Sequence, residues 1–425
     1  FKDRYLLEVN GRYDGSSKFP KSSRFGFFPS VSAGWQIAQE RFMNSTRHWL
    51  DGLKLRASYG VIGNQNINPY TFTPSMSVNN KATSWIIDDT YVTSISSLPA
   101  LVSQNFTWEK VGTINVGLDV NLFNNRLSGV FEWYQRNTNG MLAPGVQLPA
   151  VVGASAPYQN TADMRTRGWE LSLNWRDQIG KVGYRIGFNL SDYKSEIIKY
   201  DDNAATKLLS SYYPGQTLGE IWGYVVDGYY TVDDFVDTSS WQLKEGVTSI
   251  NGYNVRPGDV KFKNLRDDDT STNVITSGDN TFDNPGDRKV IGNTTPRYQY
   301  GINLGMNYAG FDLNVILQGT GKRDYWISNV LTFPMNGDNF VPLFEGLSDY
   351  WMPKDPDNGD WSAVNPNAKY PRYVWADQLG TANYYRTSTM FAYKGNYLAI
   401  REISLSYSLP QNIARKFYCQ KLDVS

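Results

Sequence analysis

Residues 113–136 read TINVGLDVNLFNNRLSGVFEWYQR, and this stretch decides the class of fold. Along its first half every second residue is apolar: Ile114, Val116, Leu118, Val120 and Leu122. Successive side chains of a strand point to opposite faces, so the pattern predicts a strand with one apolar and one polar face. A tight turn is predicted at 123–125, and the apolar face returns on a second strand at Leu127, Phe131 and Trp133.

The same alternation recurs along the chain, and no helical periodicity of comparable length competes with it. It predicts ten strands, near residues 4–15, 25–37, 52–61, 107–122, 126–136, 167–176, 183–192, 297–308, 311–320 and 396–409. Residues 418–425 are the predicted start of an eleventh strand. The sequence therefore predicts an all-β, antiparallel fold.

Alternation alone does not separate a membrane barrel from a soluble β-sandwich, because a sandwich turns its apolar face inward and a barrel in lipid turns it outward. The predicted strands are about ten residues long, as a tilted strand across the hydrocarbon layer requires, whereas sandwich strands have about five or six residues. Aromatic residues gather toward strand ends, as at Tyr298, Tyr300 and Tyr308, and amphipathic rings favour the membrane–water boundary. Both features favour the barrel.

The predicted connections alternate between short and long. Short turns are expected at 123–125, near 177–182 and at 309–310, and long connections at 62–106, 137–166, 193–296 and 321–395. Outer-membrane barrels have short periplasmic turns and long extracellular loops, and compact soluble domains rarely carry loops this long. We therefore expect a transmembrane antiparallel β-barrel with long extracellular loops.

Composition limits the functions that remain. The sequence has no run of about twenty apolar residues, so it predicts no membrane-spanning helix. Aromatic residues make up 15% of the 425 residues. The net charge is zero, so nothing indicates a nucleic-acid partner. The single cysteine, Cys419, excludes an internal disulfide, and the single histidine, His48, in a turn-like stretch, fits a surface residue better than a member of a catalytic triad. We expect no enzymatic activity.

The predicted sheet is incomplete. The sequence begins at Phe1 without a signal peptide before the first strand, and ten or eleven strands leave two sheet edges. An open sheet edge is not stable in lipid, because its backbone groups have no partners there. We therefore expect other parts of the protein to supply the remaining strands.

Several motifs, in this order, resemble those of SusC/RagA-type TonB-dependent outer-membrane transporters. They are FFPSVSAGW (27–35), LKLRASYG (53–60), GNQ (63–65), WE (108–109), GLD (117–119), LFNNRL (122–127), GWE (168–170), GY (223–224), DG (227–228), PGD (257–259), GNYL (395–398) and REISLSYSLP (401–410). The resemblance covers nearly the whole chain, and the ordered set is more specific than any single motif.

The resemblance implies a 22-stranded plugged barrel, of which this chain forms roughly the second half. It places the plug, the TonB-contacting N-terminal segment and the last strands outside this sequence. Members of this family import oligosaccharides, glycans or peptides across the outer membrane of Gram-negative bacteria. The implied partners are a SusD-like surface lipoprotein and the TonB–ExbB–ExbD complex.

One loop is a weak candidate for a calcium site. Asn264, Asp267, Asp268 and Asp269 follow the PGD motif, where relatives often carry an EF-hand-like run. Calcium requires oxygen ligands and a sharp glycine turn, but Arg266 stands at a ligand position and Asp269 replaces the glycine. A solvated acidic loop is therefore the favoured interpretation, and no cofactor is expected.

Tryptophans in the long loops are the candidate substrate-binding residues: Trp85, Trp222, Trp241, Trp326, Trp351, Trp361 and Trp375. Their rings would stack on sugar or peptide near the barrel mouth; loop packing or contact with a lid protein is the favoured alternative for each one. The lumen-facing charged residues are expected mainly to form ion pairs toward the plug: Arg12, Arg56, Glu132, Arg176 and Glu402.

Energised import is the leading hypothesis. A passive pore or structural barrel is the second, and a plug with a TonB-contacting motif would distinguish the two. A soluble adhesin or carbohydrate-binding β-protein is a third. Nothing in the sequence identifies the substrate.

Overall fold

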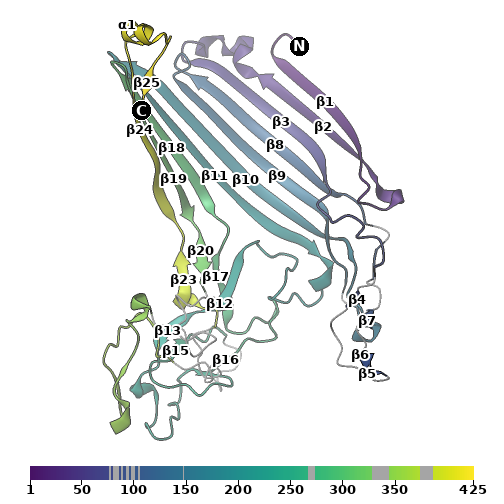
Figure 1. Cartoon of the computed structure of the whole chain (residues 1–425), viewed down its shortest axis with the longest axis vertical. Coiled ribbons are helices and arrows are strands. Elements are labelled where there is room, and N and C mark those ends of the chain that lie inside the picture. Colours follow the sequence, from purple (N-terminus) through teal and green to yellow (C-terminus); the bar gives the residue numbers. More distant parts are fainter. Residues whose placement is uncertain are drawn as a thin grey trace.

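The structure is a computed structural model of the chain (Figure 1). It describes residues 1–75, 101–103, 106–146, 148–266, 273–327, 344–373 and 386–425, together with short strands at 78–79, 86–87, 90–91 and 95–96. Within these ranges, eleven strands form one continuous antiparallel sheet. In sheet order they are β1 (Tyr5–Gly15), β2 (Phe25–Gln36), β3 (Leu50–Asn64), β8 (Glu109–Leu122), β9 (Leu127–Pro144), β10 (Tyr158–Ile179), β11 (Val182–Tyr200), β18 (Arg297–Tyr308), β19 (Phe311–Lys322), β24 (Tyr397–Ser408) and β25 (Asp423–Val424).

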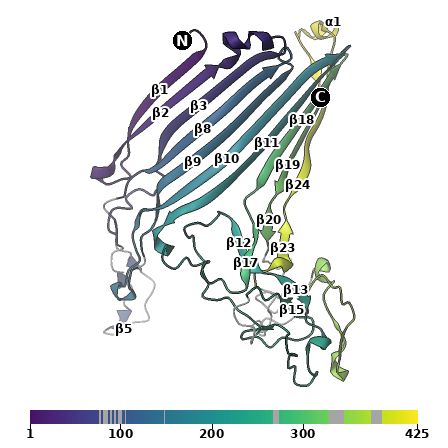
Figure 2. The same cartoon turned by 180° about the vertical axis from the view of Figure 1, so that it is seen from behind.

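The sheet is open. β1 and β25 form its two edges, and the views from the front and from behind show one curved wall of long tilted strands (Figures 1 and 2). Each strand pairs with its sequence neighbours in the sheet, as expected for an up-and-down arrangement. The predicted eleventh strand is present as the short β25, which pairs with the end of β24.

The strand register joins all the apolar positions into one face. Leu118 of β8 lies opposite Leu55 of β3 and Phe131 of β9, and the row continues to Leu171 of β10 and Leu190 of β11. No described segment covers this face, so Leu7 is 74% and Val9 71% exposed. A soluble sandwich would cover such a surface with a second sheet, which argues against the soluble alternative.

The central strands are longer than the alternation predicted. β9, β10 and β11 have 18, 22 and 19 residues. The connections expected at 137–166 and 193–296 are therefore wrong in their bounds, because β9 and β10 leave only residues 145–157 between them and β11 extends to Tyr200. The apolar side chains end before the strands do, and the backbone ladder needs no apolar residues to continue.

Short turns lie at one end of the sheet and long connections at the other (Figures 1 and 2). The predicted turn at Phe123, Asn124 and Asn125 is tight, with all three residues at φ 58°. The short-turn end also carries 3₁₀ helices at Ile37–Gln39 and Arg41–Thr46 and the single-turn α1 (Gln411–Ala414). Among the described residues, no helix is long and apolar enough to cross a membrane.

At the long-connection end, residues 201–296 and 323–396 pack on one another, and we call their described parts the loop unit. Short strands pair within it: β12 (Glu220–Tyr224) with β17 (Arg288–Asn293), β13 (Val226–Tyr229) with β15 (Val260–Phe262), β14 (Ser249–Ile250) with β16 (Val274–Ile275), β20 (Asp324–Trp326) with β23 (Ala392–Lys394), and β21 (Pro353–Asp355) with β22 (Asp360–Ala363).

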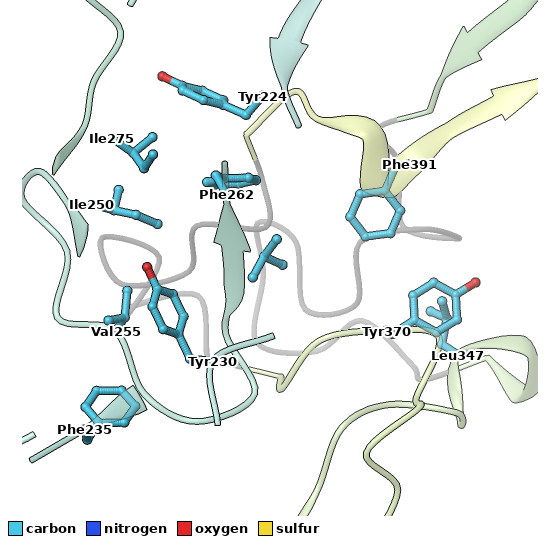
Figure 3. Packing of buried hydrophobic residues seen from close by; sticks show 11 residues of the cluster. Tyr224, Tyr230, Phe235, Ile250, Val255, Phe262, Ile275, Leu347, Tyr370 and Phe391 are labelled. Atoms are coloured by element: carbon cyan, nitrogen blue, oxygen red, sulfur yellow. The ribbon is translucent and has the colours of Figure 1, made fainter. Parts of the chain in front are cut away.

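The loop unit has its own hydrophobic core (Figure 3). Both connections contribute: Tyr230, Phe262 and Ile275 come from the first, and Leu347 and Phe391 from the second. All five are at most 1% exposed. Burial of this kind offsets the entropy cost of ordering long loops, so the loop unit is a packed body rather than two independent loops.

A second, smaller core lies under the connection that joins β3 to β8. It contains Phe19, Phe28, Phe106 and Trp108, and the Trp108 indole nitrogen donates to the carbonyl of Arg24 at 3.0 Å. Phe28 and Trp108 belong to two of the sequence motifs quoted above. These motif residues therefore hold the connection onto β2 and β3.

Candidate functional site

The polar face of the sheet carries a network of charges. The Arg56 guanidinium donates to Asp119 at 3.1 Å and also to Glu132, which accepts a further hydrogen bond from Asn115 at 3.2 Å. Gly117 lies beneath this network, and a Cβ there would fall 2.7 Å from Arg56 Cζ, so the glycine makes room for the arginine. Arg56 and Glu132 thus form ion pairs within the sheet, with each other and with Asp119, and the expected pairs toward the plug stay a prediction.

A hollow of about 530 Å³ lies beside this network on the same face. Side chains of β1, β2, β3 and β8 line it, among them Glu8, Lys54, Arg56 and Asn115. Another predicted lumen residue, Arg12, pairs with Asp14 on its own strand at 2.6 Å. The polar face therefore offers charged and hydrogen-bonding groups that can contact a solute or another part of the protein.

In the loop unit, one ion pair joins the two connections. Asp259 is fully buried and accepts two hydrogen bonds from one terminal nitrogen of Arg372, at 2.9 and 3.1 Å. Burial raises the pKa of Asp259 to about 6, although Arg372 opposes this shift. A backbone hydrogen bond also joins the two connections, because the backbone nitrogen of Arg372 donates to the Gly258 carbonyl at 2.8 Å.

A cleft of about 780 Å³ opens on the loop unit between residues 228–233 and 359–368. Tyr229 and Trp361 line it together with the edge of Trp351. The Tyr229 hydroxyl donates to the Ala368 carbonyl at 3.0 Å, and burial raises the pKa of Tyr229 above its ordinary value. The hydroxyl is therefore protonated at neutral pH and holds the two sides of the cleft together.

Acidic groups also line the cleft. Asp360 accepts hydrogen bonds from the Ser362 hydroxyl at 2.5 Å and from the Ser362 backbone nitrogen at 3.0 Å, and these hold the pKa of Asp360 below its ordinary range. Asp233 lies on the opposite wall. Aromatic faces next to carboxylates suit ligands that combine apolar ring or aliphatic surfaces with hydrogen-bond donors, as sugars and peptides do.

The model of one protein family, described as "TonB dependent receptor-like, beta-barrel", matches residues 1–413. The chain belongs to this family. Its relatives include TonB-dependent receptor P3 of Formosa agariphila, which is 28% identical over 98% of this chain and 38% of that protein. TonB-dependent receptor SusC of Bacteroides thetaiotaomicron is 34% identical over 46% of this chain and 20% of that protein.

Solved structures agree with the fold of this TonB-dependent receptor. The structure of the RagAB peptide transporter matches it with a TM-score of 0.70 and 22% sequence identity, over 97% of this chain and 40% of the other. The resemblance to SusC/RagA-type transporters is therefore confirmed, and the fold is that of a β-barrel domain. The chain spans 38% to 40% of the length of receptor P3 and of the RagAB transporter chain.

The predicted tryptophans of this receptor have different environments. Trp351 is 2% exposed and Trp326 packs against the core of the loop unit, so packing accounts for these two. Trp222 donates to the Tyr213 hydroxyl at 3.2 Å, which also ties it into the loop unit. Trp361 lines the cleft, and Trp241 contacts its ring edge-to-face at 5.1 Å between centroids. Two further candidates, Trp85 and Trp375, lie outside the described residues.

The calcium candidate stays a prediction. Asp267, Asp268 and Asp269 lie outside the described residues. The side-chain oxygen of Asn264 accepts a hydrogen bond from the backbone nitrogen of Arg266 at 3.0 Å. The buried Asp287 organises the flanks of this loop instead. Its carboxylate accepts hydrogen bonds from the backbone nitrogens of Leu265 and Thr276, at 3.0 and 2.7 Å.

Sequence reasoning missed Tyr229, Asp233 and Arg372. Tyr229 directly follows the DG motif, and Asp259 ends the PGD motif, so both positions carried a local signal. Arg372 lies 113 residues beyond Asp259, and no local pattern connects them. The cleft likewise forms only where residues 228–233 of one connection meet residues 359–368 of the other.

Proposed function

We propose that the complete protein imports an oligosaccharide, glycan or peptide across the outer membrane of a Gram-negative bacterium, with energy from TonB. The observation that carries the proposal is the uncovered apolar face of a long-stranded sheet in a chain that belongs to this family. That face needs an apolar surrounding, and lipid supplies it.

Aromatic residues at both ends of the apolar face support this placement in a bilayer. Tyr13 and Phe25 stack at the long-connection end, with ring centroids 5.4 Å apart. At the short-turn end, Phe311 and Tyr407 lie 4.6 Å apart, and Trp175 donates to the Tyr184 hydroxyl at 3.3 Å. Barrels in outer membranes carry such aromatic girdles at both interfaces.

The remaining parts of the barrel are proposed to come from the rest of the protein. β1 and β25 leave unpaired sheet edges, which lipid cannot satisfy. In the proposed 22-stranded barrel, further strands close the ring, a plug fills the polar interior, and an N-terminal segment contacts TonB. The hollow beside Arg56 faces that interior.

The loop unit is proposed to form the outer mouth and to dock a SusD-like lipoprotein. Its cleft is the proposed contact for captured substrate. A solved relative is named a peptide transporter, but at 22% identity that likeness extends to the fold and does not select one class of substrate. The aromatic and acidic lining of the cleft is compatible with both sugars and peptides.

Uptake by cells tests energised import against a passive pore. Cells that carry the full-length gene would be given labelled oligosaccharide and peptide mixtures, with gene-deleted cells as the baseline. Import that depends on TonB stops when an uncoupler collapses the inner-membrane proton gradient. Gene-dependent uptake that continues in the presence of the uncoupler would favour the passive pore.

A matched variant makes the result specific to TonB. Deletion of the TonB-contacting segment from the otherwise complete protein should abolish gene-dependent uptake and leave the amount of protein in the outer membrane unchanged. Undiminished uptake by that variant would contradict the proposal.

A further inference from the structure

On the neighbouring strands β9, β10 and β11, the face that is apolar nearer the short turns becomes polar toward the long connections. Along β10 the order is Leu171, Trp169 and then Arg167, and along β11 it is Leu190, Asp192 and then Lys194. Register places Trp169 opposite both Trp133 of β9 and Asp192 of β11. The change therefore falls at one position in the strand register, immediately beyond the cross-strand partners Trp133 and Trp169.

Among the described residues near this position are the cations Arg165, Arg167, Lys194 and Arg297, and carboxylates neutralise two of these four. Arg297 forms a bidentate ion pair with the buried Asp192, and Arg165 pairs with Glu196 at 3.1 Å. Arg167 and Lys194 remain. Within the part of the chain that the structure describes, no carboxylate forms an ion pair with either of them, and both side chains are exposed.

Arg167 and Lys194 are direct cross-strand partners. Directly opposite side chains in a sheet have Cβ atoms roughly 5 Å apart, and like charges at this distance destabilise the pair. Gln135 accepts a hydrogen bond from Arg167 Nε at 2.7 Å, which orients the guanidinium without neutralising it. An anion bound between the two cations would remove the repulsion.

We propose that Arg167 and Lys194 bind the phosphate group of a lipid in the outer leaflet, and this inference rests on the membrane placement in the proposed function. The acyl chains of that lipid lie along the apolar surface that begins at Trp169, Leu171 and Phe131. Phe131 and Trp169 stack with centroids 6.5 Å apart, and Trp169 lies two residues from Arg167 on the same strand, so the apolar surface begins next to the cations in the sheet. Guanidinium and ammonium groups both bind phosphate oxygens well.

The position selects a lipid over a free anion. A phosphate with attached acyl chains gains apolar contact as well as charge, whereas inorganic phosphate gains charge alone. Basic clusters next to a membrane surface bind anionic lipid headgroups for the same reason. The structure thus assigns this site on the lipid face to a phosphate-bearing lipid.

The test uses the full-length protein in nanodiscs of phosphatidylcholine doped with either lipid A or an uncharged glycolipid. After gentle detergent extraction, native mass spectrometry measures the lipid that stays bound. The wild-type protein should retain lipid A selectively. The double variant R167Q/K194Q should retain it roughly 25-fold more weakly, from about a fivefold contribution of each cation.

The matched control removes the same charge from the other face. Arg176 and Arg185 are also direct cross-strand partners, but they lie on the polar face near the short-turn end. R176Q/R185Q should retain lipid A as the wild type does. Equal loss of lipid A in both double variants would overturn the proposal, as would wild-type protein without preference for lipid A.

Two further arms separate the sources of failure. Inorganic phosphate that displaces lipid A at equimolar concentration would show a free-anion site and overturn the lipid assignment. Wild-type protein that does not enter the nanodiscs would contradict the proposed membrane placement as well. Entry without selective retention would contradict only this inference.

Discussion

At the scale of single residues, Gly258 meets two constraints at once. Its φ is 88°, which L side chains rarely adopt, and a Cβ there would overlap the indole ring of Trp351. Gly258→Ala should therefore destabilise the loop unit by about 3 kcal/mol, from backbone strain and displacement of the buried indole. The rate of proteolysis within residues 201–296 of the full-length protein, under native conditions, measures this opening.

Gly246 provides the control, because it has φ 84° but a Cβ there would have no other atom within 4 Å. Gly246→Ala should show only the backbone cost, about 1 kcal/mol. Equal effects of the two substitutions would show that contact with Trp351 contributes nothing.

The tryptophans of the loop unit should divide into binding and packing residues. Both rings line the cleft, but Trp361 is only partly buried whereas Trp351 is 2% exposed, so the two substitutions should have different effects. Trp361→Ala should weaken substrate binding about tenfold, the loss of one stacking contact, with little change in resistance to proteolysis. Trp351→Ala should destabilise the loop unit by about 3–5 kcal/mol.

Binding measured by isothermal titration, together with proteolysis of the same samples, separates these effects. If Trp361→Ala binds substrate as tightly as the wild type, the cleft is not the binding site.

At the scale of the strand, the two faces should respond differently to charge. Leu118 lies in the middle of the apolar row and Asn115 on the polar face beside Glu132. Leu118→Arg should cost about 2–4 kcal/mol, because lipid does not solvate the guanidinium. Asn115→Arg should cost much less. Urea titration of the refolded full-length protein in lipid vesicles measures both; a larger cost at Asn115 would reverse the assignment of the faces.

The link between the two connections predicts a pH-dependent effect. Arg372→Met leaves the buried Asp259 carboxylate without its charged partner, which should destabilise the loop unit by about 3–5 kcal/mol at pH 8. The folded pKa of Asp259, about 6, lies above the ordinary 3.8 of an unfolded chain. The folded state therefore binds the proton more tightly, and lowering the pH to 5 should reduce the cost.

Proteolysis of the loop unit at both pH values provides the measurement. The second substitution Asp259→Asn in the Arg372→Met background should restore stability at pH 8, because it removes the unpaired charge. A cost that is the same at pH 5 and pH 8 would contradict a role for the carboxylate.

At this scale the sequence predicted the strands well and the connections poorly. Ten strands and the start of an eleventh were expected from alternation, and the sheet contains them in that order. Alternation missed the long-connection ends of β9, β10 and β11, because residues such as Arg165 and Lys194 occupy the face that is apolar nearer the short turns. A strand can continue wherever its backbone is paired, whatever its side chains.

At the scale of the whole molecule, the connections 65–108, 201–296 and 323–396 are large enough to form a platform. The described parts of the last two pack around one core. We expect this platform to dock a SusD-like lipoprotein, so gentle detergent extraction of the full-length protein should recover a second polypeptide in stoichiometric amount. Recovery of this polypeptide alone, checked by mass analysis, would favour loops that cap the barrel without a partner.

The sequence by itself determined where the strands lie and which face of each strand is apolar and which is polar. It could do so because a period of two residues is a local property of the extended chain. It also placed the tight turn at Phe123-Asn124-Asn125 and the family motifs. Only the tertiary structure brought Asp259 to Arg372, formed the cleft beside Trp361, and set Arg167 opposite Lys194. These contacts depend on how distant segments pack and in which register they pair, and no local periodicity specifies that.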